Sequence, residues 1–186
     1  MTPYAIALFV HFLGLVGLFV GYGLEWTASS LLRRSTTTSQ VRSWLRIYRL
    51  SLPISGPGLL ILILSGGYLA AATGGMKQGW ISASLLGILL AMGIGFVLIL
   101  PRMKVLRAAL PEADAPLSDR GQVLVQDPMI LTLVRIRAIL ALGIVYLMTT
   151  KPLTLSTSLF ILLGAIVVGM LCAATAWGSK PAAEKA

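Results

Sequence analysis

Residues 4–25 read YAIALFVHFLGLVGLFVGYGLE, a stretch in which only His11 and Glu25 have side chains that can be charged near neutral pH. A bilayer core about 30 Å thick needs roughly 20 apolar residues for one helical span. The stretch is long enough and apolar enough to meet this requirement. It therefore predicts a transmembrane helix.

Four further stretches have the same character, at 50–73, 80–100, 129–149 and 155–177. The chain has 186 residues, of which 57% are hydrophobic and 11% are charged, and its mean hydropathy is +0.90. A soluble domain cannot bury so large an apolar fraction, because much of any small domain's surface stays exposed. The predicted fold is an all-α, polytopic transmembrane bundle of about five helices.

The basic residues predict the orientation of this bundle. All 15 lysines and arginines except Lys77 and Lys151 lie in or beside segments that follow the first, third and fifth spans. Cytoplasmic loops carry such an excess. We therefore expect the N-terminus outside, a cytoplasmic loop at 101–128, a cytoplasmic tail at 178–186, and a location in the inner (cytoplasmic) membrane.

This asymmetry also accounts for the net charge of +9, so we do not expect a nucleic-acid partner. The expected partners are the lipid bilayer and either other membrane subunits or a second copy of the chain. The arginines between Arg33 and Arg49 could also contact anionic lipid headgroups, at about 1 kcal/mol per basic residue near the surface. No basic segment precedes the first span, which predicts a retained helix rather than a cleaved signal peptide.

The first span has one face on which small and ionisable residues gather. His11 and Glu25 are separated by close to four helical turns, and Gly14, Gly17 and Gly21 lie on or beside the same stripe. Small residues let a neighbouring helix approach closely. We therefore expect this face to point into the bundle.

Glu25 lies near the cytoplasmic end of its span, at the depth of two arginines in the fourth span. Ionisable residues inside a membrane pair with one another, because an isolated charge there is costly. The sequence predicts an ion pair between Glu25 and either Arg135 or Arg137. We expect the pair to fix the first helix against the fourth.

His11 lies in the outer half of its span, and two interpretations remain open. In one it is the axial ligand of a b-type haem, in an outward-facing pocket with residues from the second, third and fourth spans. The predicted pocket residues are His11, Tyr68, Ser84, Tyr146 and Met148. In the other, His11 forms a hydrogen bond to a neighbouring helix.

The sequence gives little support for an enzyme. The chain has one histidine and one cysteine, Cys172, so we expect no metal site built from side chains alone and no hydrolytic triad. Pro53 and Pro57 could kink the second span as in a transporter, although no internal repeat supports that interpretation.

Three short motifs resemble a group of small bacterial membrane proteins of unknown function. These are LFVHFLG at 8–14, Gly79-Trp80 before the third span, and MTTKP at 148–152. The same motifs are distantly similar to HemJ-type protoporphyrinogen oxidases and to the CopD copper-resistance membrane domain. The HemJ resemblance implies haem ligation by His11.

The chain departs from the HemJ pattern at two positions. Ser84 stands where that family uses a lysine in the third helix, and the region 135–138 replaces its early Asn-Glu motif in the fourth. Porphyrinogen oxidation is therefore not carried over. We expect a non-catalytic small membrane subunit or scaffold that packs against a larger complex, with haem binding through His11 as the alternative and a small transporter as a third, more distant one.

Overall fold

The computed structural model describes residues 2–111 and 113–177 of the chain. Every regular element in these residues is helical, and five helices are long and apolar enough to cross a membrane. The predicted all-α membrane bundle is therefore confirmed. The tail expected at 178–186 lies outside the described residues.

The helices follow one another with short connections. In chain order they are α1 Pro3–Leu32, α2 Thr38–Ala72, the 3-10 turn η1 Gly75–Lys77, α3 Gly79–Gly93, the π-helical segment η2 Ile94–Ile99, α4 Leu100–Ala108, α5 Asp119–Val125, α6 Pro128–Thr150 and α7 Leu155–Trp177. The segments α3, η2 and α4 form one continuous helix from Gly79 to Ala108. The π-helical segment in its middle has a wider backbone turn than the α-helical segments on either side.

Local signals set several of these ends. The Thr2 hydroxyl caps α1 by accepting a hydrogen bond from the Ala5 N–H at 3.3 Å. The Asp127 carboxylate caps α6 in the same way, ahead of Pro128 in its first turn. These are the residue types that helix N-termini favour. Lys151 ends α6 in the left-handed region, at φ 46°.

Several helices are longer than the predicted spans. Helix α1 continues to Leu32 and α2 begins at Thr38, because both extensions bury apolar residues against the rest of the molecule. Part of the loop expected at 101–128 is also helical, as α4 and α5. Helix α4 continues the long helix that begins at Gly79, and α5 is a separate short helix; each has a buried apolar side.

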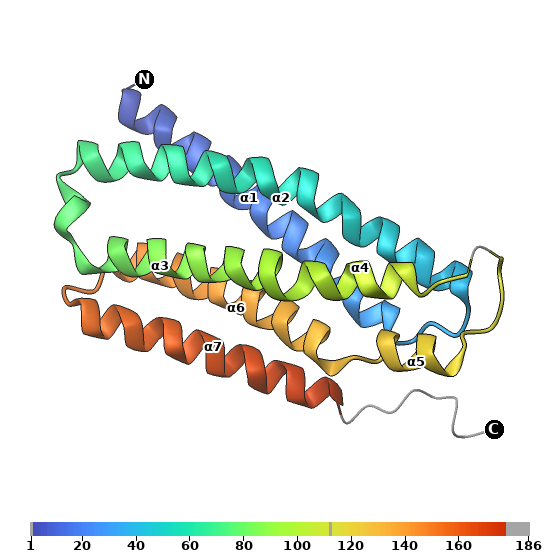
Figure 1. The fold of residues 1–186 in the computed structure, drawn as a ribbon. Helices are drawn as coiled ribbons and strands as arrows, with labels where there is room; N and C mark the ends of the chain where they lie inside the picture. The colour runs from blue at the N-terminus through green and yellow to red at the C-terminus, as the bar shows by residue number, and fades with distance from the viewer. Residues whose placement is uncertain (1, 112, 178–186) are drawn as a thin grey trace.

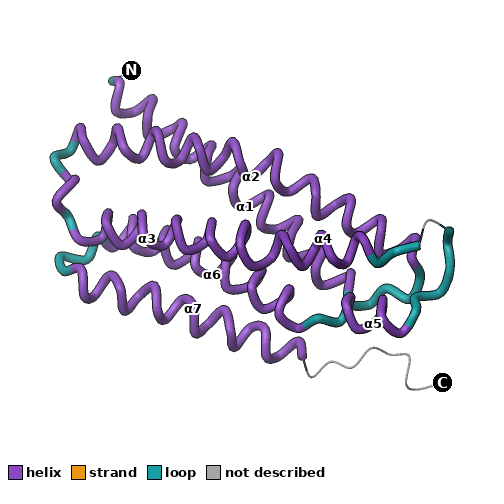
Figure 2. Tube along the Cα trace, viewed as in Figure 1, coloured by secondary structure: helices purple, strands orange, loops and turns teal. Residues whose placement is uncertain are grey.

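The helices form two groups (Figures 1 and 2). Helices α1 and α2 pack against each other as an antiparallel pair, whereas α3, α6 and α7 pack together as a second group. The main contact between the two groups is that of α1 with α6. Residues on α1 that face α6 therefore decide how the molecule is held together.

Helices α1 and α2 approach closely because both carry small residues where they cross. A Cβ atom added to Gly14 would lie 2.8 Å from the Gly58 carbonyl oxygen, and one added to Gly21 would lie 2.5 Å from Ser55 Cβ. Gly17 lies between them, against the Gly58 backbone. The small-residue face of α1 is thus occupied by α2 within the same chain.

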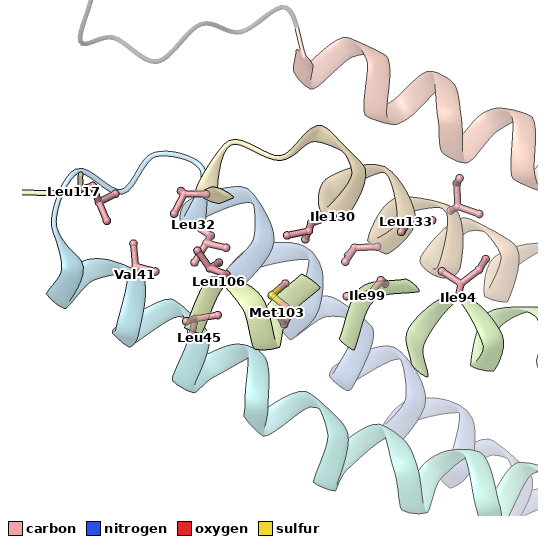
Figure 3. Packing of buried hydrophobic residues seen from close by; sticks show 13 residues of the cluster. Leu32, Val41, Leu45, Ile94, Ile99, Met103, Leu106, Leu117, Ile130 and Leu133 are labelled. Carbon is pink, nitrogen blue, oxygen red and sulfur yellow. The ribbon is translucent and has the colours of Figure 1, made fainter. Parts of the chain in front are cut away.

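A buried apolar cluster closes the end of the molecule where the α1–α2 connection, α4 and α5 meet (Figure 3). It includes Leu32, Val41, Leu106, Leu117 and Ile130, which come from five different parts of the chain. The cluster explains why the helices extend past their predicted spans. Each extension contributes apolar side chains that water would otherwise surround.

The segment between α4 and α5 is tied to the start of α2. The Thr38 N–H donates to the Ala115 carbonyl at 3.0 Å, and the Leu117 N–H donates to the Thr36 carbonyl at 3.0 Å. The Asp114 carboxylate accepts a hydrogen bond from the Ser39 N–H at 3.1 Å. Hydrogen bonds from Ser39 hold the pKa of the Asp114 carboxyl below its usual range, as a helix N-terminus favours the ionised form.

The close crossing of α1 and α2 predicts that two neighbouring glycines differ in their tolerance of a methyl group. Gly21→Ala should lower the unfolding free energy by about 1–3 kcal/mol, as overpacking of a filled site does. Gly23→Ala is the matched control, because a Cβ there meets nothing within 4 Å; it should leave stability unchanged or slightly raised. Thermal melting in detergent, followed by circular dichroism, measures both. Equal melting temperatures for the two variants would contradict the crossing.

Candidate functional site

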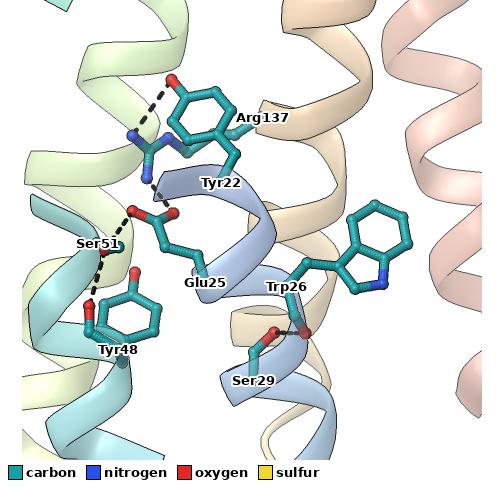
Figure 4. Close-up of polar contacts among 7 residues, drawn as sticks. All are labelled: Tyr22, Glu25, Trp26, Ser29, Tyr48, Ser51 and Arg137. Atoms are coloured by element: carbon teal, nitrogen blue, oxygen red, sulfur yellow. Dashed lines mark hydrogen bonds and ion pairs between the residues drawn. The ribbon is translucent and has the colours of Figure 1, made fainter. Parts of the chain in front are cut away.

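The structure brings Glu25 of α1 to Arg137 of α6 (Figure 4). Arg137 Nη1 donates to Glu25 Oε2 at 2.7 Å. The Glu25 side chain is 6% exposed and the Arg137 side chain is 13% exposed. This is a short, charge-assisted contact inside the bundle, and it joins the two helix groups.

Two further side chains and one backbone carbonyl complete the surroundings of this ion pair (Figure 4). The Ser51 hydroxyl of α2 lies 3.0 Å from Glu25 Oε1 and 2.7 Å from the Tyr48 carbonyl oxygen, so its one proton serves one acceptor at a time. Arg137 Cζ lies 4.6 Å from the centroid of the Tyr22 ring, whose hydroxyl accepts from Nη2 at 3.4 Å. A guanidinium gains from such a ring when water is excluded.

Gly95 in the π-helical segment makes room for the guanidinium of Arg137. A Cβ added to Gly95 would lie 2.9 Å from Arg137 Cζ. Segments of π-helix occur frequently at functional sites, because they shift the helix register locally. Here the segment presents a residue without a side chain to the ion pair.

Arg135 does not meet Glu25. Its guanidinium lies 5.0 Å from the centroid of the Trp26 ring, and Nη1 donates to the Cys172 carbonyl of α7. Arg135 thus links α1, α6 and α7 near the same depth as the ion pair. The two arginines contact different partners, because they point to different sides of α6.

The arrangement is suited to holding helices together. Each charge would cost several kcal/mol to bury alone, even after the protein relaxes around it. Together the partners neutralise one another, and Ser51 and Tyr22 satisfy further hydrogen-bonding capacity. Glu25 Oε2 faces Arg137 and Oε1 faces the Ser51 hydroxyl, so the carboxylate contacts groups from both α6 and α2.

A cavity of about 500 Å³ lies beside the ion pair, between α2 on one side and η2 with α4 on the other. Its lining combines the ion pair with basic and apolar side chains. The residues are Glu25, Leu45, Tyr48, Arg49, Ser51, Leu52, Pro53, Gly95, Phe96, Leu100, Met103, Lys104, Arg107 and Arg137. Its volume falls within the range of about 300–1,000 Å³ for ligand sites.

His11 contacts α2, and not the outward pocket that the sequence predicts. Its Nδ1 lies 3.0 Å from Ser65 Oγ, and the Ser65 hydroxyl also lies 2.5 Å from the Ile61 carbonyl. A carbonyl oxygen can only accept, so the Ser65 proton goes to Ile61. In the neutral tautomer that carries its proton on Nδ1, the Ser65 oxygen accepts from His11 Nδ1–H and Nε2 is the unprotonated nitrogen.

The other predicted pocket residues are dispersed. Ser84 is buried on α3 and donates to the Trp80 carbonyl at 2.8 Å. Met148 packs against the apolar cluster of α3, α6 and α7. Tyr68 and Tyr146 are 47% and 54% exposed. Ser84 is thus set apart from His11, because α1 packs on α2 and α6 whereas Ser84 belongs to α3. Tyr68 lies on α2, in the lining of a pocket to which Ser65 also belongs.

Within the described part of the chain, no group of three or more His, Cys, Asp or Glu side chains could hold a metal ion.

Sequence reasoning identified Glu25 and Arg137 but missed Tyr22, Tyr48, Ser51 and Gly95. Ser51 lies in a span among apolar residues, which is a signal for an internal hydrogen bond. A glycine at the depth of an intramembrane arginine could have been read as room for its side chain. The tyrosines gave no comparable signal.

The ion pair predicts strong coupling between its two members. Glu25→Gln or Arg137→Gln alone should destabilise the protein by about 3–5 kcal/mol, because each leaves an unpaired buried charge. The double variant should cost less than the sum of the singles. Arg102→Gln is the control: its contact with Asp127, at 3.6 Å and about one-third exposed, should contribute about 0–1 kcal/mol. Unfolding in mixed micelles measures all four; additive single effects would exclude the pairing.

The comparison with known proteins places this site within a family. Residues 5–152 match the family described as "Predicted integral membrane protein (DUF2269)", a range that contains Glu25, Arg137 and the whole cavity lining but not α7. Neither the curated proteins nor the solved structures give a significant match. The similarity to HemJ-type and CopD-like proteins is not tested by these findings and stays a prediction. Because the matched range covers well over half of the chain, the protein belongs to the DUF2269 family of integral membrane proteins.

Proposed function

We propose that the protein is a non-catalytic integral membrane subunit or scaffold, which packs against a larger membrane complex or a second copy of itself. The observation that carries this proposal is the buried contact of Glu25 with Arg137. Glu25 is buried, with one oxygen facing Arg137 and the other facing the Ser51 hydroxyl. Such a carboxylate joins α1 to α6 and α2, which supports a structural role rather than acid–base chemistry.

The surface available to a partner is apolar and lies away from the α1 glycines. Those glycines contact α2, so they cannot serve another subunit. Helix α7 packs on α3 and α6, and its opposite face carries Phe160 and Leu163, which are 73% and 56% exposed. Lipid or an apolar helix of another membrane protein fits this face.

The orientation that we propose has the N-terminus outside and the basic end in the cytoplasm, in the inner (cytoplasmic) membrane. Most basic residues lie around the α1–α2 connection, α4 and α5, at one end of the bundle. Lys77 and Lys151 lie in the two connections at the opposite end. The positive-inside rule supports this orientation.

The subunit proposal predicts stoichiometric co-purification with other membrane proteins. Chemical cross-linking in intact membranes, followed by purification in a mild detergent, should give a complex of constant composition. Gly164→Leu on α7 and Gly56→Leu on α2 form a matched pair, because a Cβ at either position meets nothing within 4 Å. Loss of the complex in one variant would locate the contact. A stable lone monomer recovered after cross-linking would contradict the proposal.

Binding of b-type haem through His11 is the second candidate function. The hydrogen bond to Ser65 supports it, because a ligating histidine usually donates its other ring N–H to a neighbouring acceptor. In the tautomer with Nδ1–H directed to Ser65, the lone pair of Nε2 is available to ligate iron. An external ligand or a second chain would then complete the coordination.

Haem binding predicts a Soret absorption band in protein that is produced with ample haem. His11→Ala should remove the band. Ser65→Ala should lower the affinity for haem by about 10–100-fold, as the loss of a partner of a metal ligand does. Tyr146→Phe is the control, because the Tyr146 side chain is exposed. A missing band, or one that His11→Ala leaves unchanged, would exclude this function.

A further inference from the structure

The cavity beside the ion pair has two chemically different parts. Its inner part contains Glu25, Arg137, Ser51 and Tyr48, which are held by α1, α2 and α6. Its outer part is bordered by three basic side chains, Arg49 on α2 with Lys104 and Arg107 on α4. The remaining lining residues are mainly apolar.

The charges of the cavity are not balanced. Glu25 is its one acidic lining residue, and Arg137 neutralises it. Arg49, Lys104 and Arg107 are exposed and form no salt bridge to any residue that the structure describes. Three cations that share one cavity repel one another, and a bound anion would relieve this repulsion.

Part of the cavity lining is apolar and exposed. Leu52, Phe96 and Leu100 belong to its lining, yet they are 54%, 52% and 38% exposed. Helices α2 and α3 pack against other helices rather than against each other. Leu45 and Met103 belong to the buried cluster at the basic end, next to the cavity (Figure 3).

We propose that this cavity binds one anionic phospholipid from the leaflet at the basic end of the bundle. The phosphate lies among Arg49, Lys104 and Arg107, and an acyl chain leaves over Leu52 and Phe96 into the bilayer. Arginine and lysine are the side chains that bind phosphate oxygens. A soluble anion would use the cations but would leave the apolar mouth without a partner.

This site goes beyond the proposed function, because it rests on the cavity and its charges and not on a partner subunit. It also differs from nonspecific attraction of anionic lipid to a basic surface. Nonspecific attraction depends on the number of charges near the membrane. Binding in a cavity depends on which of the charges are removed.

The test compares two triple variants of equal charge. The cavity variant carries Arg49→Gln, Lys104→Gln and Arg107→Gln. The control variant carries Arg34→Gln, Arg46→Gln and Arg120→Gln, which are exposed and do not line the cavity. Native mass spectrometry of the full chain counts bound lipid during titration with phosphatidylglycerol, phosphatidylcholine or inorganic phosphate. Circular dichroism establishes that each variant is folded.

The proposal expects one tightly bound phosphatidylglycerol per chain in the wild type and in the control variant. The cavity variant should bind it at least about tenfold more weakly, since each basic residue contributes to the attraction. Phosphatidylcholine should bind weakly to all three proteins. Equal loss in both variants would assign the binding to surface charge and overturn the proposal. Inorganic phosphate that displaces the lipid at comparable concentration would overturn it as well.

Misfolding of the cavity variant would not end the test. Leu52→Arg places a cation at the exposed apolar mouth without removing a basic residue. If the acyl chain leaves the cavity over Leu52, this substitution should weaken phosphatidylglycerol binding in spite of the added positive charge. Stronger binding would show that charge alone attracts the lipid and would overturn the proposal.

Discussion

The contact between Glu25 and Arg137 joins two charges inside helices whose outer surfaces are mainly apolar. Neither charge can be left unpaired there without a large loss of free energy, so the position of each constrains the position of the other. Several other features follow from this requirement. Gly95 gives the guanidinium room, Tyr22 covers its face, and Ser51 meets the second oxygen of Glu25.

The glycine crossing and the ion pair depend on one another. Ser51 reaches Glu25 only because α1 and α2 cross closely at Gly14, Gly21 and Gly58. The resulting hairpin then presents Glu25 to α6 as a single fixed group. Because α2 does not pack along α3, space remains beside the ion pair, where the cavity with its basic border lies.

The helical class and the number of spans could be predicted, because lipid demands long apolar segments and leaves a strong trace in the sequence. The extensions at the basic end could not be read in the same way. Residues 101–108 and 119–125 are helical, but their apolar sides are short and mixed with charges. They are stabilised by the cluster around Leu32 and Val41, which depends on tertiary contacts.

Depth along the helices could suggest that Glu25 meets an arginine, but not which one. Arg135 and Arg137 are two residues apart and so point to nearly opposite sides of α6, and the choice depends on which side meets α1. Ser84 does not lie beside His11, contrary to the prediction from the sequence, for a related reason. Equal depth does not make helices neighbours, and Ser84 belongs to α3, which packs with α6 and α7 rather than with α1.

The most direct measurement of the central contact is solid-state NMR of the protein in lipid bilayers. Dipolar recoupling between isotope-labelled glutamate carboxyl carbons and arginine guanidinium nitrogens detects a direct ion pair, and Glu25→Gln assigns the signal. The account predicts an ionised Glu25 carboxylate with strong coupling to Arg137, in keeping with their 2.7 Å contact. A protonated Glu25 carboxyl, or the absence of any coupling to Arg137, would contradict it.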